Sequence, residues 1–144
     1  MEKVSAAQED YLEAILALEA LHGRVRVRDM SERLSVHKST VTAALKMLAE
    51  KGLIEYEPYG RIVLTDVGRK TGERVVERHA KLKTFLRDIL DVDADAAEEN
   101  ACRMEHVIDP VVLDRLEQFT GYMQEKRGKG RECLTGFRAF LGGA

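Results

Sequence analysis

Apolar residues recur at helical spacing over residues 6–22, and the Gly23 that follows is typical of a helix end. The next segment, RVRVR at 24–28, alternates basic and apolar residues, which fits either a short edge strand or an extended lead-in to a helix. Two further periodic segments are predicted to be helices, one from Val27 or Asp29 to Leu34 and one from Lys38 or Ser39 to Gly52. Two helices joined by a short turn indicate a helix-turn-helix.

A β-hairpin is predicted directly after these helices. The segments LIEYE (53–57) and RIVLT (61–65) alternate apolar and polar residues on either side of the turn residues Pro58, Tyr59 and Gly60. A helix-turn-helix followed by a hairpin is the order of a winged helix-turn-helix.

The rest of the chain is predicted to be helical, so the expected fold class is mainly α. Periodicity favours a long helix from about Asp66 to Leu90, a helix over 95–108 and another over 110–125. Residues 126–131 have the composition of a linker, and the remaining residues leave room for a short helix. We therefore divide the chain at residues 1–72, 73–127 and 128–144.

Composition excludes several classes of protein. The chain has 144 residues, of which 44% are hydrophobic and 33% charged, and only 2 are Pro, as in an ordinary globular domain. No apolar run approaches the roughly 18 residues of a membrane span, and residues 1–20 are too acidic for a signal peptide. The 2 cysteines do not make a disulfide framework. We expect a soluble cytoplasmic protein with no membrane partner.

The net charge of −2 conceals an uneven distribution. Residues 22–83 carry 14 basic and 8 acidic side chains, whereas residues 1–21 have a net charge of −4 and residues 84–125 one of −8. A basic block between acidic ones fits a surface that binds a polyanion, although an unevenly charged solvated surface has the same pattern.

Small hydroxylated side chains at the start of the third helix favour double-stranded DNA as that polyanion. Such residues let a helix approach a groove closely and bond to base edges or phosphates, and neighbouring cations neutralise the backbone. The alternative is a helix N-terminus with solvated basic residues. The residues expected to contact DNA are Arg28, His37, Lys38, Ser39, Thr40, Thr42, Lys46 and, on the wing, Arg61.

Three potential metal ligands share one face of the predicted helix 95–108. Cys102, Glu105 and His106 stand at i, i+3 and i+4, and thiolate, carboxylate and imidazole together suit a divalent transition metal. A zinc hydrolase or a thiol–imidazole enzyme would need a further group or an open site that the sequence does not supply, so we expect no enzyme.

Two carboxylates and a histidine elsewhere complete the candidate metal set. Asp10 and Glu13 stand at i, i+3 on the first helix, and His79 lies among apolar residues of the long helix. Each also has a structural explanation, since helix N-termini favour acidic residues and core histidines are often hydrogen-bonded.

Several longer segments together resemble the metal-dependent transcriptional repressors that include the diphtheria toxin repressor, the iron-dependent regulators and the manganese transport regulators. The resemblance covers roughly residues 5–125 and rests on EDYLEAI (9–15), VHKSTVTAALKMLAEKGLIEYEPYG (36–60), IVLTDVGRKTG (62–72), the Arg-His of ERHAKLKTFL (77–86) and CRMEHVI (102–108). It implies a homodimer in which each subunit joins a winged helix to a helical dimerisation region, with a divalent metal as co-repressor at their junction.

The resemblance implies a hybrid ligand set. The iron branch has Cys, Glu and His at the positions of Cys102, Glu105 and His106, but typically Met at the position of Asp10. The manganese branch matches at Asp10, Glu13, His79, Glu105 and His106, but has Glu at the position of Cys102. The co-repressor is therefore expected to be Fe(II) or Mn(II), with Co(II), Ni(II) and Zn(II) able to bind in vitro. Because a thiolate is a softer ligand than a carboxylate, we favour Fe(II).

The resemblance also bears on a second metal site. The ancillary site of the iron branch uses a His that matches His79, whereas its Glu and further His correspond to Lys83 and Glu98. Lys83 is a cation where a ligand would be needed, so we do not expect an iron-type ancillary site, although Glu98 remains capable of binding metal. The usual C-terminal barrel of the iron branch has no counterpart in these 144 residues, so the chain resembles the shorter members.

The expected function is metal-dependent repression of metal-homeostasis genes. Without metal, the carboxylates of Asp10, Glu13 and Glu105 repel one another, and a divalent ion would remove that repulsion and select one spacing of the recognition helices. The alternative is a winged-helix regulator that senses a small organic ligand without metal.

Overall fold

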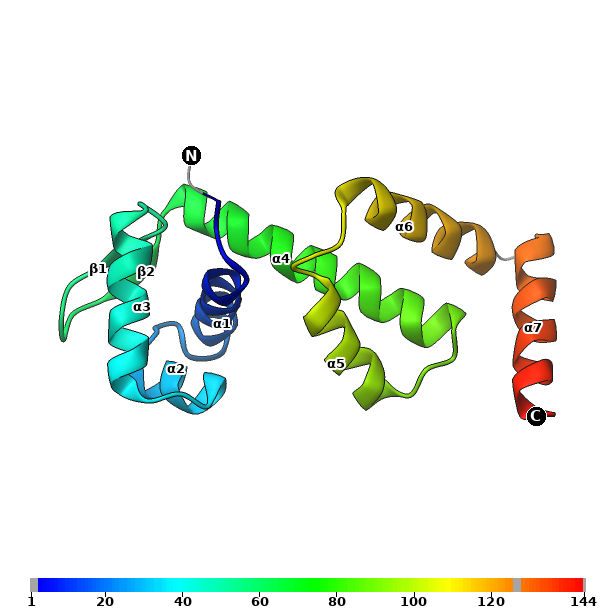
Figure 1. Cartoon of the computed structure of the whole chain (residues 1–144), viewed down its shortest axis with the longest axis horizontal. Coiled ribbons are helices and arrows are strands. Elements are labelled where there is room, and N and C mark those ends of the chain that lie inside the picture. The colour runs from blue at the N-terminus through cyan, green and yellow to red at the C-terminus, as the bar shows by residue number, and fades with distance from the viewer. Residues whose placement is uncertain (1–2, 126–127, 144) are drawn as a thin grey trace. The chain divides into compact units, whose positions relative to one another are not determined.

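A computed structural model describes residues 3–125 and 128–143, and this part of the chain is mostly helical (Figure 1). Its elements are α1 (Ala6–His22), α2 (Val27–Leu34), α3 (Lys38–Glu50), β1 (Ile54–Tyr56), β2 (Ile62–Leu64), α4 (Asp66–Thr84), the π-helical turn η1 (Phe85–Ile89), α5 (Ala94–Met104), α6 (Pro110–Gln124) and α7 (Lys129–Gly142). The chain folds as two compact units, residues 1–76 and 77–144, and α4 crosses from the first into the second. The predicted fold class, mainly α with a small wing, is confirmed.

Local capping signals determine the ends of α1. Ser5 accepts a hydrogen bond from the backbone N–H of Gln8 at 3.3 Å, and the Gln8 side chain accepts one from the Ser5 N–H at 3.0 Å, which makes a capping box. Gly23 ends the helix in the left-handed conformation with φ of 68°. Residues 24–26 then lead into α2 without strand pairing, and Arg26 has extended backbone angles.

The first unit has one hydrophobic core under its helices and hairpin. Its fully buried members are Leu12, Ile15, Met30, Val41, Leu45 and Leu48. The hairpin pairs β1 with β2 antiparallel, with Ile54 opposite Leu64, and both of these side chains are buried against the core. The wing is thus attached to the same core that positions α3.

A close contact joins the hairpin to the start of α4. The Thr65 hydroxyl donates to the Gly52 carbonyl at 2.7 Å and accepts from the Gly68 N–H at 3.1 Å. A Cβ at Gly68 would lie 1.8 Å from the Leu53 carbonyl oxygen, so only glycine fits there. The helix that leaves the first unit is therefore anchored directly to the wing.

The second unit packs α4, η1, α5, α6 and α7 around two small cores. Leu82, Leu86, Ala97, Ala101 and Leu113 form one, and Ile89, Met123 and Leu134 form the other, which holds α7 against its neighbours. No helix in the described part of the chain is long and apolar enough to cross a lipid bilayer.

Two predicted helix boundaries in the second unit were wrong. The helix predicted over 95–108 ends at Met104, and residues 105–107 form a turn, so the last ligand positions lie beyond the helix. α7 extends over 14 residues from Lys129, where a linker and a short helix had been expected; residues 126 and 127 of that linker lie outside the described residues. Burial of Leu134 against Met123 explains the longer helix, since tertiary packing outweighs the glycines of this segment.

Candidate metal centre and nucleic-acid interface

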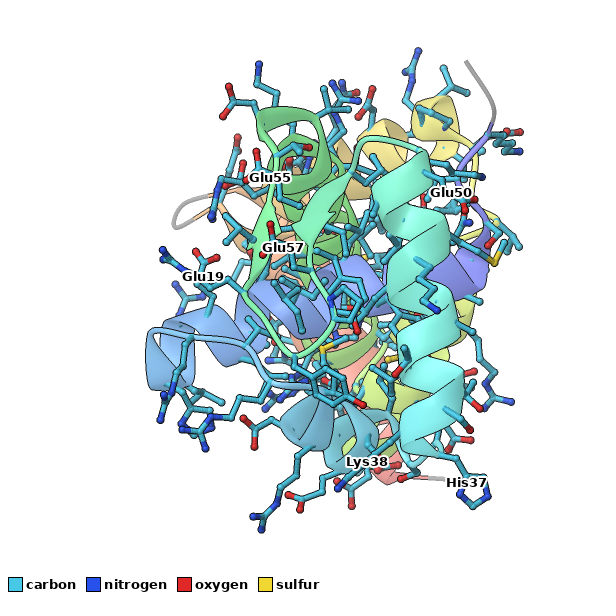
Figure 2. All side chains as sticks on the ribbon, turned by 90° about the vertical axis from the view of Figure 1, so that its left-hand side faces the viewer. Glu19, His37, Lys38, Glu50, Glu55 and Glu57 are labelled. Atoms are coloured by element: carbon cyan, nitrogen blue, oxygen red, sulfur yellow. The ribbon has the colours of Figure 1, made fainter. Side chains whose placement is uncertain are left out.

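A groove in the first unit runs between the N-terminal half of α3, the hairpin and the segment before α2. Its lining includes Arg28, Lys38, Ser39, Thr42, Lys46 and Arg61, which are predicted DNA-contacting residues. Exposed His37 and Lys38 project at the N-terminal end of α3 (Figure 2). Thr40 is also exposed on α3, but neither it nor His37 lines the groove.

Two local contacts restrict side chains of this surface. The Thr42 hydroxyl donates to the Lys38 carbonyl one turn earlier at 2.9 Å, which leaves its oxygen lone pairs as acceptors for an incoming group. Arg28 Nε lies 3.1 Å from Glu32 on an exposed face of α2, and such a surface pair is weak enough for a phosphate to compete with it.

Carboxylates mark the limit of the basic surface. Glu50 lies at the C-terminal end of α3, and Glu55 and Glu57 lie on and next to β1, away from His37 and Lys38 (Figure 2). Carboxylates repel a phosphate backbone, so the side of α3 near its N-terminus and the hairpin tip are the parts of this unit suited to DNA.

His79 of α4 lies between two carboxylates of the second unit. Its Nδ1 is 2.7 Å from Glu105 Oε2, and its Nε2 is 3.0 Å from Glu98 Oε1. Burial alone would lower the pKa of His79, but the hydrogen bonds and charges of Glu98 and Glu105 outweigh it and raise that pKa.

Glu105 is the most deeply buried acid of this centre, with a side chain that is 0% exposed. Its second oxygen, Oε1, lies 3.3 Å from His106 Nε2, so one carboxylate contacts two imidazoles. A buried carboxylate is costly without positive charge nearby, and two imidazoles beside it are typical ligands for a divalent transition metal.

Cys102 belongs to the same region through His79. Ligand atoms of His79, Glu98 and Cys102 all lie within 4.8 Å of one another, although Cys102 and Glu98 are exposed. Lys83 Nζ lies 2.6 Å from Glu98 Oε2, and this hydrogen bond, opposed by burial and helped by His79, lowers the pKa of Glu98.

The donor chemistry of the second unit therefore fits a divalent transition metal. His79, Glu105 and His106 supply two nitrogens and a buried carboxylate, and the Cys102 sulfur lies near His79 and Glu98. The predicted ligands Asp10 and Glu13 belong to the first unit, on α1, where Asp10 is exposed and Glu13 is half-buried.

Sequence reasoning left several residues out of these sites. Glu98 was only noted as capable of binding metal, and its contact with His79 depends on how α5 packs against α4. In the groove, Arg24 and Tyr59 had not been assigned, although the alternation of RVRVR puts Arg24 on the same side as Arg26 and Arg28. Tyr59 is fully exposed at the hairpin tip.

Two family models match consecutive parts of the chain. The model described as the iron dependent repressor N-terminal DNA binding domain matches residues 3–62. The model described as the iron dependent repressor metal binding and dimerisation domain matches residues 65–132.

Two curated proteins show a similarity that extends over most of the chain. The HTH-type transcriptional regulator MntR of Geobacillus kaustophilus is 40% identical over 123 residues, which cover 83% of this chain and 84% of that protein. An uncharacterised HTH-type transcriptional regulator of Methanocaldococcus jannaschii is 32% identical over 124 residues, which cover 85% of this chain and 99% of that protein.

Two solved structures with a similar fold belong to chains longer than this one. A manganese-dependent transcriptional repressor in complex with manganese has a TM-score of 0.71 and 30% identity, and the match covers 84% of this chain and 55% of that one. The manganese regulator SloR has a TM-score of 0.71 and 26% identity, with the same coverage. The chain thus spans about half the length of these two proteins.

Proposed function

Because the chain belongs to the iron-dependent repressor family of metal-dependent, DNA-binding transcriptional regulators, we propose that it is a cytoplasmic homodimer that represses metal-homeostasis genes. Binding to a double-stranded operator would require Fe(II) or Mn(II). The observation that carries the metal requirement is the buried Glu105 carboxylate in contact with His79 and His106. Family membership agrees with the resemblance drawn from the sequence.

The proposed metal ligands are His79, Cys102, Glu105 and His106, joined by Asp10 and Glu13 from α1. The chemistry of the donors supports the first four, and the resemblance of EDYLEAI to the manganese branch supports the two α1 carboxylates. A bound divalent ion supplies positive charge that offsets the carboxylates, and ligands from both units would couple metal binding to the DNA-binding unit.

The proposed DNA contacts divide by chemistry. Ser39, Thr40 and Thr42 offer hydroxyls to base edges, whereas His37, Lys38 and Lys46 are directed to phosphates or bases. Arg28 and Arg61 would contact the DNA backbone beside the DNA groove that α3 enters. In a dimer, two copies of α3 would read half-sites about one helical turn, or a multiple, apart.

Removal of the Arg61 side chain from the wing is expected to weaken binding to all DNA sequences similarly. Arg61 lines the groove and is exposed, so Arg61→Ala should lose about one phosphate contact and reduce the slope of log affinity against log salt by about 1. Fluorescence anisotropy with operator and unrelated DNA at several salt concentrations measures this, with Arg87→Ala on η1 as a control. An unchanged salt slope would show that the wing does not contact the backbone.

The thiolate is expected to bias the centre towards Fe(II). Cys102→Glu replaces a soft ligand by a hard one, and should therefore raise the Mn(II) response relative to the Fe(II) response, by about tenfold. The measurement is operator binding at controlled free metal, made anaerobically because Cys102 is exposed. A wild type that already prefers Mn(II), together with an unchanged preference in Cys102→Glu, would exclude Cys102 as a ligand.

The proposed function as a whole is tested by operator binding titrated with Fe(II), Mn(II), Co(II) and Zn(II). Binding should appear with metal and be lost in excess chelator. Operator binding that chelator leaves unchanged would contradict the proposal and would favour a regulator that senses an organic ligand.

A further inference from the structure

The two carboxylates beside His79 occupy opposite sides of its ring. Nδ1 meets Glu105, whose side chain is 0% exposed, and Nε2 meets Glu98, whose side chain is 49% exposed. A neutral imidazole has one N–H and one lone pair, so it can donate a hydrogen bond on one side and bind a metal on the other. The surroundings of the ring therefore select the nitrogen that binds metal.

Lys83 offsets the carboxylate charge on the Nε2 side. Its Nζ lies 2.6 Å from Glu98 Oε2, while Glu98 Oε1 lies 3.0 Å from the ring. A carboxylate paired with an ammonium remains a hydrogen-bond acceptor, so when a metal takes the Nδ1 lone pair, Nε2 can carry the hydrogen and donate it to Glu98. A divalent ion on this side would be repelled by the Lys83 ammonium.

The Nδ1 side has the opposite character. The buried Glu105 carboxylate lies 2.7 Å from Nδ1 and 3.3 Å from His106 Nε2. Carboxylate and imidazole donors thus converge where the dielectric is low and the attraction for a cation is strongest.

We infer that Glu98 and Lys83 are positioning residues for the metal centre: Glu98, held by Lys83, keeps the hydrogen of His79 on Nε2, so that Nδ1 offers its lone pair to the metal beside Glu105. This inference rests on the proposed metal-dependent function. A metal-binding histidine whose second nitrogen donates to a carboxylate is a recurrent arrangement, and loss of the carboxylate typically lowers metal affinity by about 10-fold to 100-fold.

Nuclear magnetic resonance identifies the metal-bound nitrogen directly. The full chain, labelled with ¹⁵N-histidine and loaded with diamagnetic Zn(II), should show His79 with metal on Nδ1 and hydrogen on Nε2 in long-range ¹H–¹⁵N spectra. Single substitutions of the other three histidines by Gln assign the signals. Metal on Nε2 would overturn the inference and make Glu98 a ligand, whereas absence of any zinc binding would refute the proposed metal site itself.

Affinity and stoichiometry of Zn(II) binding give a second test. Glu98→Ala should bind as many ions per subunit as wild type but about 10-fold to 100-fold more weakly. The control is Glu99→Ala, because Glu99 pairs with Arg103 on the exposed side of α5 and should not matter. Loss of one ion from Glu98→Ala, with unchanged affinity for the rest, would show that Glu98 is a ligand and overturn the inference.

The role of Lys83 is tested by a conservative rescue. Lys83→Leu frees Glu98 from its anchor and should weaken Zn(II) binding at least about threefold, whereas Lys83→Arg should restore it. Tighter binding by Lys83→Leu would show that Lys83 acts only by repelling the metal, and would remove it from the assignment.

Discussion

Glu105→Ala is expected to abolish operator binding at metal concentrations that saturate the wild type. Glu105 is the buried carboxylate of the centre and contacts His79 and His106 through different oxygens. Its loss removes a charged proposed ligand, together with the negative charge that lies beside both imidazoles. We expect metal affinity to fall at least about 100-fold, which corresponds to about 2.7 kcal/mol.

The experiment combines anaerobic metal dialysis with operator binding by fluorescence anisotropy. Glu105→Gln preserves the volume of the side chain and separates loss of charge from a cavity, since it should also bind metal weakly. Glu99→Ala, on the exposed side of α5, should behave as wild type. Metal affinity that survives in Glu105→Gln would show that the Glu105 carboxylate is not a ligand.

Phe119→Glu is expected to dissociate the proposed homodimer. On α6, Val111, Val112, Phe119 and Tyr122 are all exposed, from 46% for Val112 and Phe119 to 70% for Val111. At 3.6 residues per turn these positions fall within about 100° of one helix face. An exposed apolar face of this kind, in a segment that matches a dimerisation domain, is a natural interface between two copies.

A carboxylate buried in that interface would lack a partner, so the dissociation constant should rise at least about 100-fold, or about 2.7 kcal/mol. Sedimentation velocity at micromolar concentration measures the effect. As a control, Leu21→Glu changes an exposed apolar residue that lies on α1 and not on the α6 face, and it should leave the dimer intact. Zinc binding by the Phe119→Glu subunit should persist, because Phe119 is not among the proposed ligands. A monomeric wild type would contradict the interface.

The parts of the fold that were correctly predicted have local causes. The bounds of α1 follow from the capping box at Ser5 and from Gly23, which act within one helical turn. The wing follows from alternation on either side of Pro58, Tyr59 and Gly60, and β1 and β2 lie within the predicted strands. Such signals need no knowledge of distant residues.

Where prediction failed, distant packing decided the outcome. The run through residue 108 is periodic enough for a helix, yet α5 stops at Met104 and Glu105 lies in the turn that follows, where it meets His79 of α4. α7 is longer than its glycine-rich sequence suggests because Leu134 packs against Met123 and Ile89. Residues far apart in the sequence supply these contacts, and the periodicity of apolar residues within one segment does not predict them.

The sequence alone determined the chemistry of this protein: a basic winged helix, followed by helices with Cys102, Glu105, His106 and His79 as candidate metal ligands. Those properties depend on residue type and short spacing. Only the tertiary structure decided which groups meet, because the packing of α4 against α5 places Glu98 between Lys83 and His79. Lys83, which stands where the iron branch has a ligand of its ancillary site, forms an ion pair with Glu98. The two sides of the His79 imidazole are therefore chemically different.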